Sequence, residues 1–126
     1  MKPYVQNIEQ ETLSNDNFRK EVFTGEHLQM TVMSIPVGGD IGLETHAHTD
    51  QFLRVEQGTG KAILDGVEYE VLDDFAIIIP AGTEHNIVNT GDVPMKLYSI
   101  YTPPEHPAGT IDQTQSDAMA REELEH

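Results

Sequence analysis

The chain has 126 residues, of which 7 are Lys or Arg and 22 are Asp or Glu, so its formal net charge is −15 with neutral histidines. This length fits one domain with a single core, and the negative field disfavours nucleic acid and anionic membrane surfaces as partners. The sequence has no cysteine, which excludes disulfides, thiolate metal sites and cysteine nucleophiles.

We expect a cytoplasmic protein, because the lack of cysteine fits a reducing compartment. The polar stretch 1–10 has no apolar core of a signal peptide. The longest apolar run, 75–80, is far shorter than the ~20 residues that cross a bilayer. We therefore expect no membrane association.

Residues 1–26 are polar and mixed, and they predict an N-terminal arm that holds a short helix or runs extended. From His27 the pattern changes to short β-branched and alternating runs separated by Gly, Pro and Asp. Asp65-Gly66 is the strongest hairpin signal among these turns. The predicted strands cover 27–35, 42–48, 52–56, 61–64, 67–72, 75–79, 85–89 and 95–101.

Short strands at roughly 8–12-residue spacing are typical of an all-β antiparallel sandwich or barrel, which we place at 27–102. Residues 103–126 are rich in proline and then polar. They predict a C-terminal tail on the surface, with at most a short helix at 118–126, that wraps around the barrel or a neighbouring molecule.

His46 and His48 carry the first chemical signal, because residues two apart on a strand face the same way. Two neutral imidazoles that meet inside a barrel need a shared partner, and a divalent metal is the usual one. His85 opens a predicted strand after a glycine turn, from which it can reach the same cavity. The other histidines are expected to be surface or packed residues: His27, His106 and His126.

The arrangement resembles two motifs of the cupin family, G-x5-H-x-H-x3-4-E-x6-G and G-x5-P-x-G-x2-H-x3-N. His46, His48 and Gly58 match the first motif, and the second is matched by Pro80, Gly82, His85 and Asn89. The chain departs from the motifs at the first glycine of each, where Asp40 and Asp74 stand. The resemblance implies a jelly-roll barrel (a double-stranded β-helix) with three histidines and one glutamate around Mn, Fe, Ni, Zn or Cu.

Gln51 stands at the position of that glutamate when residues are counted back from Gly58. The resemblance therefore implies His46, His48, Gln51 and His85 as the metal ligands. Asp50 and Glu44 share the strand parity of the two histidines and are alternatives, as is water. An amide in place of the carboxylate would leave a divalent ion with its full charge, which favours anionic substrates.

Parity also predicts which residues form the cavity wall. Leu53 and Val55 share the face of Gln51, and Ile87 and Asn89 share that of His85. Phe52 and Arg54 should then lie on the opposite face.

The family resemblance implies a metal-dependent enzyme acting on a small polar or anionic molecule, by dioxygenation, isomerisation, decarboxylation or lyase chemistry. Small cupins are often described as similar to mannose-6-phosphate isomerase. Here a phosphosugar would meet few basic residues, because between 21 and 120 the chain has only Arg54, Lys61 and Lys96. The alternative is a non-catalytic cupin that binds or senses a metal or small ligand. The resemblance also implies a homodimer, with the 1–26 arm available for strand exchange.

Overall fold

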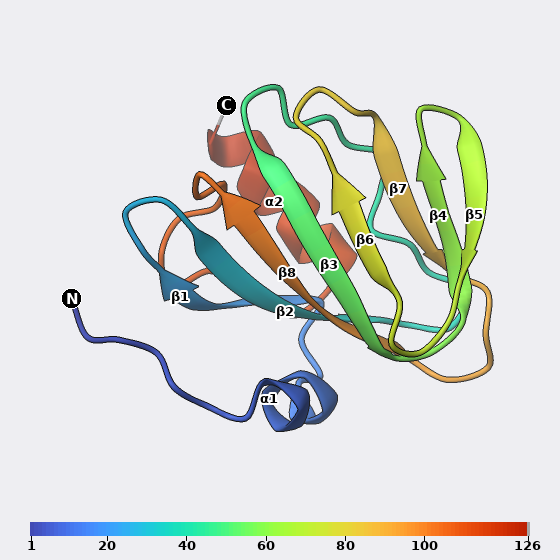
Figure 1. Cartoon of the computed structure of the whole chain (residues 1–126), viewed down its shortest axis with the longest axis horizontal. Helices are drawn as coiled ribbons and strands as arrows, with labels where there is room; N and C mark the ends of the chain where they lie inside the picture. The colour runs from blue at the N-terminus through green and yellow to red at the C-terminus, as the bar shows by residue number, and fades with distance from the viewer. Residues whose placement is uncertain (126) are drawn as a thin grey trace.

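The structure is a computed structural model that describes residues 1–125 (Figure 1). The chain builds nine strands and two helices within these residues. The helices are α1 (Ile8–Ser14) and α2 (Gln115–Glu125). The strands are β1 (Arg19–Thr24), β2 (Gln29–Ile35), β3 (Asp50–Gln57), β4 (Gly60–Leu64), β5 (Val67–Val71), β6 (Ala76–Ile79), β7 (His85–Asn89), β8 (Met95–Thr102) and β9 (Ile111–Asp112).

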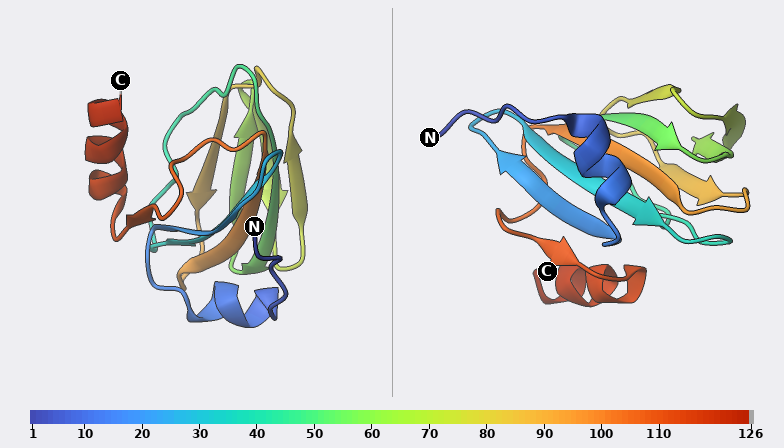
Figure 2. Two further views of the ribbon diagram at one scale, coloured as in Figure 1. Left: turned by 90° about the vertical axis from the view of Figure 1, so that its left-hand side faces the viewer. Right: turned by 90° about the horizontal axis from the view of Figure 1, so that it is seen from below.

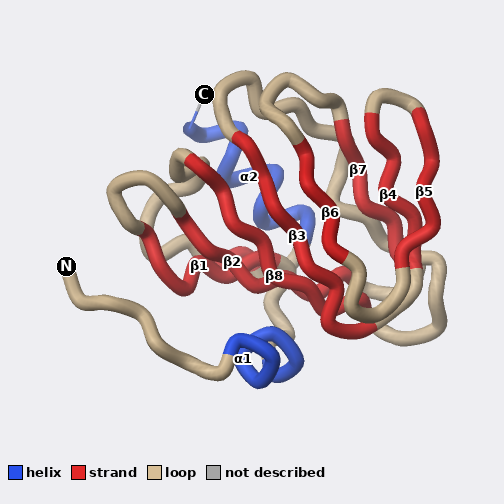
Figure 3. The backbone as a smooth tube through the Cα atoms, viewed as in Figure 1, coloured by secondary structure: helices blue, strands red, loops and turns tan. Residues whose placement is uncertain are grey.

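The strands form two antiparallel sheets, which confirms the predicted all-β class. The larger sheet has the order β6-β3-β8-β2-β1-β9, and the smaller sheet has the order β5-β4-β7. Figure 3 shows that most of the regular structure is strand and that loops connect the strands at both ends of the sheets. The predicted hairpin at Asp65-Gly66 joins β4 to β5, and both residues have the positive φ that a type I′ turn requires.

Parts of the predicted arm and of the predicted tail are built into the larger sheet. The predicted arm 1–26 contains β1, which pairs with β2 and, on its other side, with β9 from the predicted tail. Strand β9 thus extends the larger sheet, and α2, which follows it, lies on one side of the sheets (Figure 2). Neither helix in the described part of the chain is long and apolar enough to cross a membrane.

Side-chain contacts hold α2 in place. Arg121 donates hydrogen bonds to both carboxylate oxygens of Asp112 on β9, at 2.8–3.1 Å. Gln115 donates to Asp40, and Ala118 is buried. The composition of the tail does not reveal these partners, since they lie far from it in sequence.

The interior changes from apolar to polar along the strands of the larger sheet. The inward-facing residues of β3 and β7 are buried as predicted, at Leu53, Val55, Ile87 and Asn89. One row across β2, β8 and β3 is formed by Met33, Leu97 and Val55. The second inward-facing row beyond it along the same strands is formed by Gln29, Tyr101 and Gln51. Because buried polar groups need partners, this polar end is where a ligand site is expected.

Gly60 allows β4 and β7 to approach closely near the apolar end. A Cβ atom there would lie 2.2 Å from the carbonyl oxygen of Val88 and 2.3 Å from Cε of Met95. We expect Gly60→Ala to lower the free energy of unfolding by about 2 kcal/mol through overpacking. Gly91→Ala is the matched control, because its Cβ would come no closer than 3.3 Å to its neighbours. Urea denaturation measures both, and equal losses would contradict the packing argument.

Candidate metal centre

The segment 39–46 runs along the edge of β7 as an irregular extra strand. Glu44 and His85 form a two-way backbone bridge, with N–H to carbonyl distances of 2.8 and 2.9 Å. The amide of Ile41 donates to the carbonyl of Ile87, and that of Asn89 donates to the carbonyl of Gly39. This pairing sets Glu44 directly opposite His85 at the polar end of the interior.

Three side chains converge there, from Glu44, His46 and His85. Their candidate ligand atoms all lie within 4.8 Å of one another. Oε2 of Glu44 is 3.1 Å from Nε2 of His46 and 3.9 Å from Nε2 of His85. The two imidazole ring centroids are 5.2 Å apart. One ion can therefore contact one atom from each residue.

His85 presents a free nitrogen to this group. Its ring is only 2 % exposed, and Nδ1 lies 2.9 Å from the carbonyl oxygen of Thr83. Since a carbonyl only accepts, this contact places a proton on Nδ1, and in that tautomer Nε2 holds a lone pair. Nε2 is buried and has no hydrogen-bond partner among the described residues. A buried acceptor without a donor is costly, and a metal ion would satisfy it. The residues present therefore fit a divalent metal.

His46 lies between two carboxylates. Its Nε2–H donates to Glu44, and its Nδ1–H donates to Oε1 of Glu105 at 3.0 Å. Burial by itself would lower the pKa of His46, but the hydrogen bonds to Glu105 and Glu44 outweigh it and raise this pKa to about 9. Without a metal, His46 is therefore protonated at neutral pH. A metal at Nε2 would replace that proton, while Glu105 would still orient the ring through Nδ1.

Both carboxylates stay ionised because of these contacts. Burial would raise the pKa of Glu44, but the hydrogen bond from His46 and the charge of Arg19 hold it below its ordinary value. The pKa of Glu105 is lowered chiefly by its hydrogen bond with His46. The site thus holds one ionised carboxylate as a candidate ligand and a second behind it.

His48, expected beside His46, is not part of this group. Its side chain is exposed. The expectation assumed a regular strand, but the backbone bends at residues 47–48, so that side chains two apart no longer face the same way. Glu44 takes the inward position instead, and it was one of the alternatives considered for the fourth ligand.

A signal for this register is present in the sequence. Counted from Gly38, the chain has Gly38-x5-Glu44-x-His46-x4-Gln51-x6-Gly58, which matches every interval of the first motif although Gln51 still replaces its glutamate. Glu44 then stands where that motif has its first histidine. With His48 as the second histidine, only two residues would separate it from Gln51 where the motif has three or four, and counting from Gly38 removes this departure.

Gln51 is buried (4 % exposed) on β3, opposite Tyr101 of β8. Its Nε2 donates to Oγ of Ser99 at 2.9 Å, and its Oε1 is buried without a hydrogen-bond partner among the described residues. The Tyr101 ring lies 6.1 Å from that of His46. Gln51 therefore has an unused acceptor and pairs with a residue whose ring neighbours His46, and its coordination of a metal stays a prediction. Asp50 is exposed, and its carboxylate accepts from the amide of Ala81.

Two other residues beside the group carried no signal in the sequence. Glu105 comes from the predicted tail, and Arg19 comes from the predicted arm. His106, expected to be an ordinary histidine, is buried with its ring edge-to-face on Tyr101 at 5.1 Å between centroids. His126 lies outside the described residues.

Comparison with known proteins agrees with the fold and the motif. The family model described as a cupin domain matches residues 31–101. The uncharacterized protein YrkC of Bacillus subtilis is 51 % identical over 97 % of this chain and 69 % of its own length. The uncharacterized protein L612 of Acanthamoeba polyphaga mimivirus is 39 % identical over 86 % of this chain and 71 % of its own length.

Solved structures agree as well. The crystal structure of BH2720 from Bacillus halodurans superimposes with a TM-score of 0.93 at 56 % identity, covering 94 % of this chain and 95 % of the other. The structure of KdgF from Halomonas sp. has a TM-score of 0.65 at 22 % identity, over 69 % of this chain and 78 % of the other, which is a likeness of fold alone. With its family match, its double-sheet fold and its ligand group at the polar end of the interior, this chain belongs to the cupin family.

Proposed function

We propose that the protein binds one divalent transition metal through Glu44, His46 and His85, with Gln51 as the candidate fourth ligand. We further propose that it is a metal-dependent enzyme acting on a small polar or anionic molecule. The observation that carries the proposal is the buried Nε2 of His85, which faces a carboxylate and a second imidazole and has no hydrogen-bond partner among residues 1–125. When bound, the metal would supply a Lewis acid with an open position for substrate.

The donor set favours oxygenase chemistry over isomerase or lyase chemistry. Two histidines and one carboxylate with open positions are the set that holds iron(II) in non-haem oxygenases. With Glu44 as the charged ligand, the centre keeps one negative donor even though position 51 is an amide. A remaining charge of +1 still attracts an anionic substrate.

The protein's own residues would orient the metal ligands and limit access of water. The carbonyl of Thr83 fixes the tautomer of His85, and Glu105 fixes the ring of His46. The Glu105 carboxylate in turn accepts a hydrogen bond from the hydroxyl of Thr49 at 3.0 Å. The apolar rows of Leu53, Val55 and Ile87 keep the floor of the site dry. These contacts preorganise the site before any ligand arrives.

Metal addition tests the proposal. Purified metal-free protein is titrated with Mn²⁺, Fe²⁺ (under anaerobic conditions), Ni²⁺ and Zn²⁺, and thermal unfolding is followed. A metal present at a hundred times its Kd should raise Tm by roughly 10 °C. Elemental analysis of the untreated protein should show close to one metal per chain. No bound metal and no shift with any of the four ions would overturn the proposal.

Nitric oxide separates oxygenase chemistry from the other classes. Added to the Fe²⁺-loaded protein, it gives a characteristic electron paramagnetic resonance signal only where the ion keeps an open position for a diatomic ligand. We expect this signal. Its absence in protein that binds iron would refute oxygenase chemistry.

A non-catalytic metal- or ligand-sensing role is the second candidate. It is favoured by the two carboxylates nearest to the ligand group, because both are engaged by His46. Neither carboxylate is free for general acid–base work in the metal-free protein. A tightly bound metal without oxygen uptake or turnover for any small carboxylate offered would support this role.

A further inference from the structure

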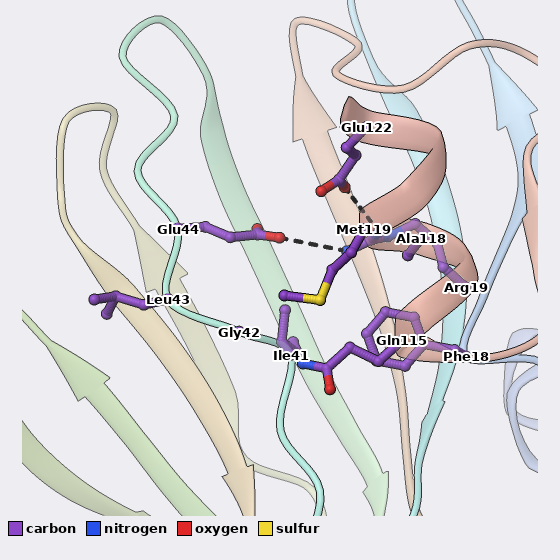
Figure 4. A pocket seen from close by; sticks show the side chains of 10 residues that line it. All are labelled: Phe18, Arg19, Ile41, Gly42, Leu43, Glu44, Gln115, Ala118, Met119 and Glu122. Atoms are coloured by element: carbon purple, nitrogen blue, oxygen red, sulfur yellow. Dashed lines mark hydrogen bonds and ion pairs between the residues drawn. The ribbon is translucent and has the colours of Figure 1, made fainter. Parts of the chain in front are cut away.

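A buried arginine lies beside the candidate metal centre. Arg19, at the start of β1, is 1 % exposed. With Glu44 it lines a cavity of about 100 Å³ between α2 and the segment 41–44. Figure 4 shows the Glu44 carboxylate pointing toward Arg19 across this cavity and Glu122 approaching from α2, while Leu43 points away. A cationic side chain and one of the three candidate metal ligands therefore line the same cavity.

The guanidinium of Arg19 uses few of its five N–H donors. Within residues 1–125, its one side-chain hydrogen bond runs from Nη1 to Oε1 of Glu122, at a long 3.3 Å. The nearest oxygens of Glu44 and Asp112 are each 3.9 Å away, beyond hydrogen-bond distance. Its Nε is buried and has no hydrogen-bond partner in the part of the chain that the structure describes. Buried guanidinium groups are usually well satisfied, so these spare donors point to a ligand.

The carboxylate nearest to the Arg19 guanidinium is that of Glu122, but the contact between them is poor. Its side chain is 33 % exposed, and it makes one long bond to Arg19 instead of the paired bonds of a bidentate contact. Burial and the charge of Glu44 raise the pKa of Glu122, although Arg19 opposes this shift. Glu122 is thus the least favourably held of the acidic residues around Arg19. By contrast, Asp112 has a bidentate partner in Arg121.

Charge and size define the ligand that would fit. Arg19 and Arg121 face three carboxylates, from Glu44, Asp112 and Glu122. If an external carboxylate took the place of the Glu122 carboxylate, the charge around Arg19 would not change. A dianionic phosphate would add a charge beside Glu44 and Asp112. The planar fork of arginine matches a carboxylate, and about 100 Å³ admits only a small one.

We propose that Arg19 binds the carboxylate group of a small organic acid, and that Glu122 on α2 holds this position until the acid displaces it. The inference rests on the proposed function in one respect, since Glu44 connects the cavity to the metal group. It names the substrate class of that site as small carboxylates. In this proposal α2 is a lid over the cavity. In its closed position, the Glu122 carboxylate contacts Arg19 where the carboxylate of the acid would bind.

Calorimetry with small acids tests this proposal. Pyruvate and propanoate are titrated into metal-free and Zn²⁺-loaded protein, with propanamide as the neutral analogue. Glu122→Gln removes the competing carboxylate, and we expect it to bind pyruvate about fivefold more tightly than the wild type. Glu123→Gln is the matched control, because it changes the net charge equally at an exposed residue of the same helix. It should change the affinity less than twofold.

Arg19→Lys keeps the charge but loses the fork, and should weaken pyruvate binding about tenfold. If this variant does not fold, the comparison of Glu122→Gln with Glu123→Gln still decides. Equal affinities in those two variants, or binding of propanamide as tight as that of propanoate, would overturn the inference. Zn²⁺ titration of the same samples reads the proposed metal site separately. If the acid binds in an Arg19-dependent way but the protein takes up no Zn²⁺, the metal proposal is refuted and the proposal for Arg19 is not.

Discussion

Replacing His46 by alanine is expected to weaken the binding of a divalent transition metal by at least about 100-fold, whereas His48→Ala should leave it unchanged. His46 contributes an atom to the candidate ligand group, and His48 is exposed outside it. Loss of a residue that merely supports a ligand costs about 10–100-fold in metal affinity, so loss of a ligand costs no less. Competition titration with a chromogenic chelator, using Zn²⁺ or Ni²⁺, measures both variants.

The two substitutions form a matched pair, because they are chemically identical and two residues apart. His46→Ala also leaves Glu44 and Glu105 without their shared partner, so circular dichroism must confirm that the variant is folded. His46→Gln, which can still donate a hydrogen bond, serves as the second variant. Equal losses of affinity in His46→Ala and His48→Ala would support the ligand set expected from the strand pattern, which includes His48, and would refute the ligand set derived from the structure.

The second large effect is a loss of stability in mild acid through His106. Burial, followed by the charges of Arg19 and Arg121, lowers the pKa of His106 to about 3. The unfolded chain binds this proton near pH 6.5 and the folded protein does not. The contribution of the neutral, buried His106 to the free energy of unfolding is therefore complete above pH 6.5 and falls as the pH drops toward 3, by about 1.4 kcal/mol per pH unit. The loss should reach about 2.7 kcal/mol at pH 4.5.

His106→Phe removes the titrating group and keeps an aromatic ring on Tyr101. The backbone N–H and carbonyl of His106 keep their bonds with Gln29, since these do not involve the side chain. Urea denaturation of metal-free protein between pH 7.5 and 4.5 should give a flatter dependence for His106→Phe than for the wild type. His27→Phe, at an exposed position, controls for the substitution itself. Parallel curves for the wild type and His106→Phe would show that His106 does not cause the acid sensitivity.

Much of the framework could be predicted from local patterns. The alternation in β3 and β7 identified Leu53, Val55 and Ile87 as inward-facing, because the side-chain period of a strand is two. The Asp65-Gly66 turn was predictable because few residues tolerate two successive positive φ angles. Two of the four expected ligands, His46 and His85, lie in the candidate group.

The remaining ligands depend on long-range pairing. The pattern at 42–48 predicted a strand, but the segment follows β7 through separate backbone bonds and then bends. That pairing, and not the alternation of the segment, turns Glu44 inward and His48 outward. Motif spacing counted from Gly38 would have indicated the same register. Local composition could not decide between the two alignments, because glycines or turn-forming residues stand at each candidate start.

By itself, the sequence determined the all-β class, the cupin motifs and the two histidines of the candidate ligand group. Each of these follows from periods and spacings of a few residues. Only the tertiary structure decided that Glu44 completes the group, that Glu105 supports it, and that Arg19 and Glu122 meet at its side. Those residues come from segments as far apart as β1 and α2. Their meeting depends on sheet order and helix docking, which are set by the packing of the whole chain and not by any local pattern.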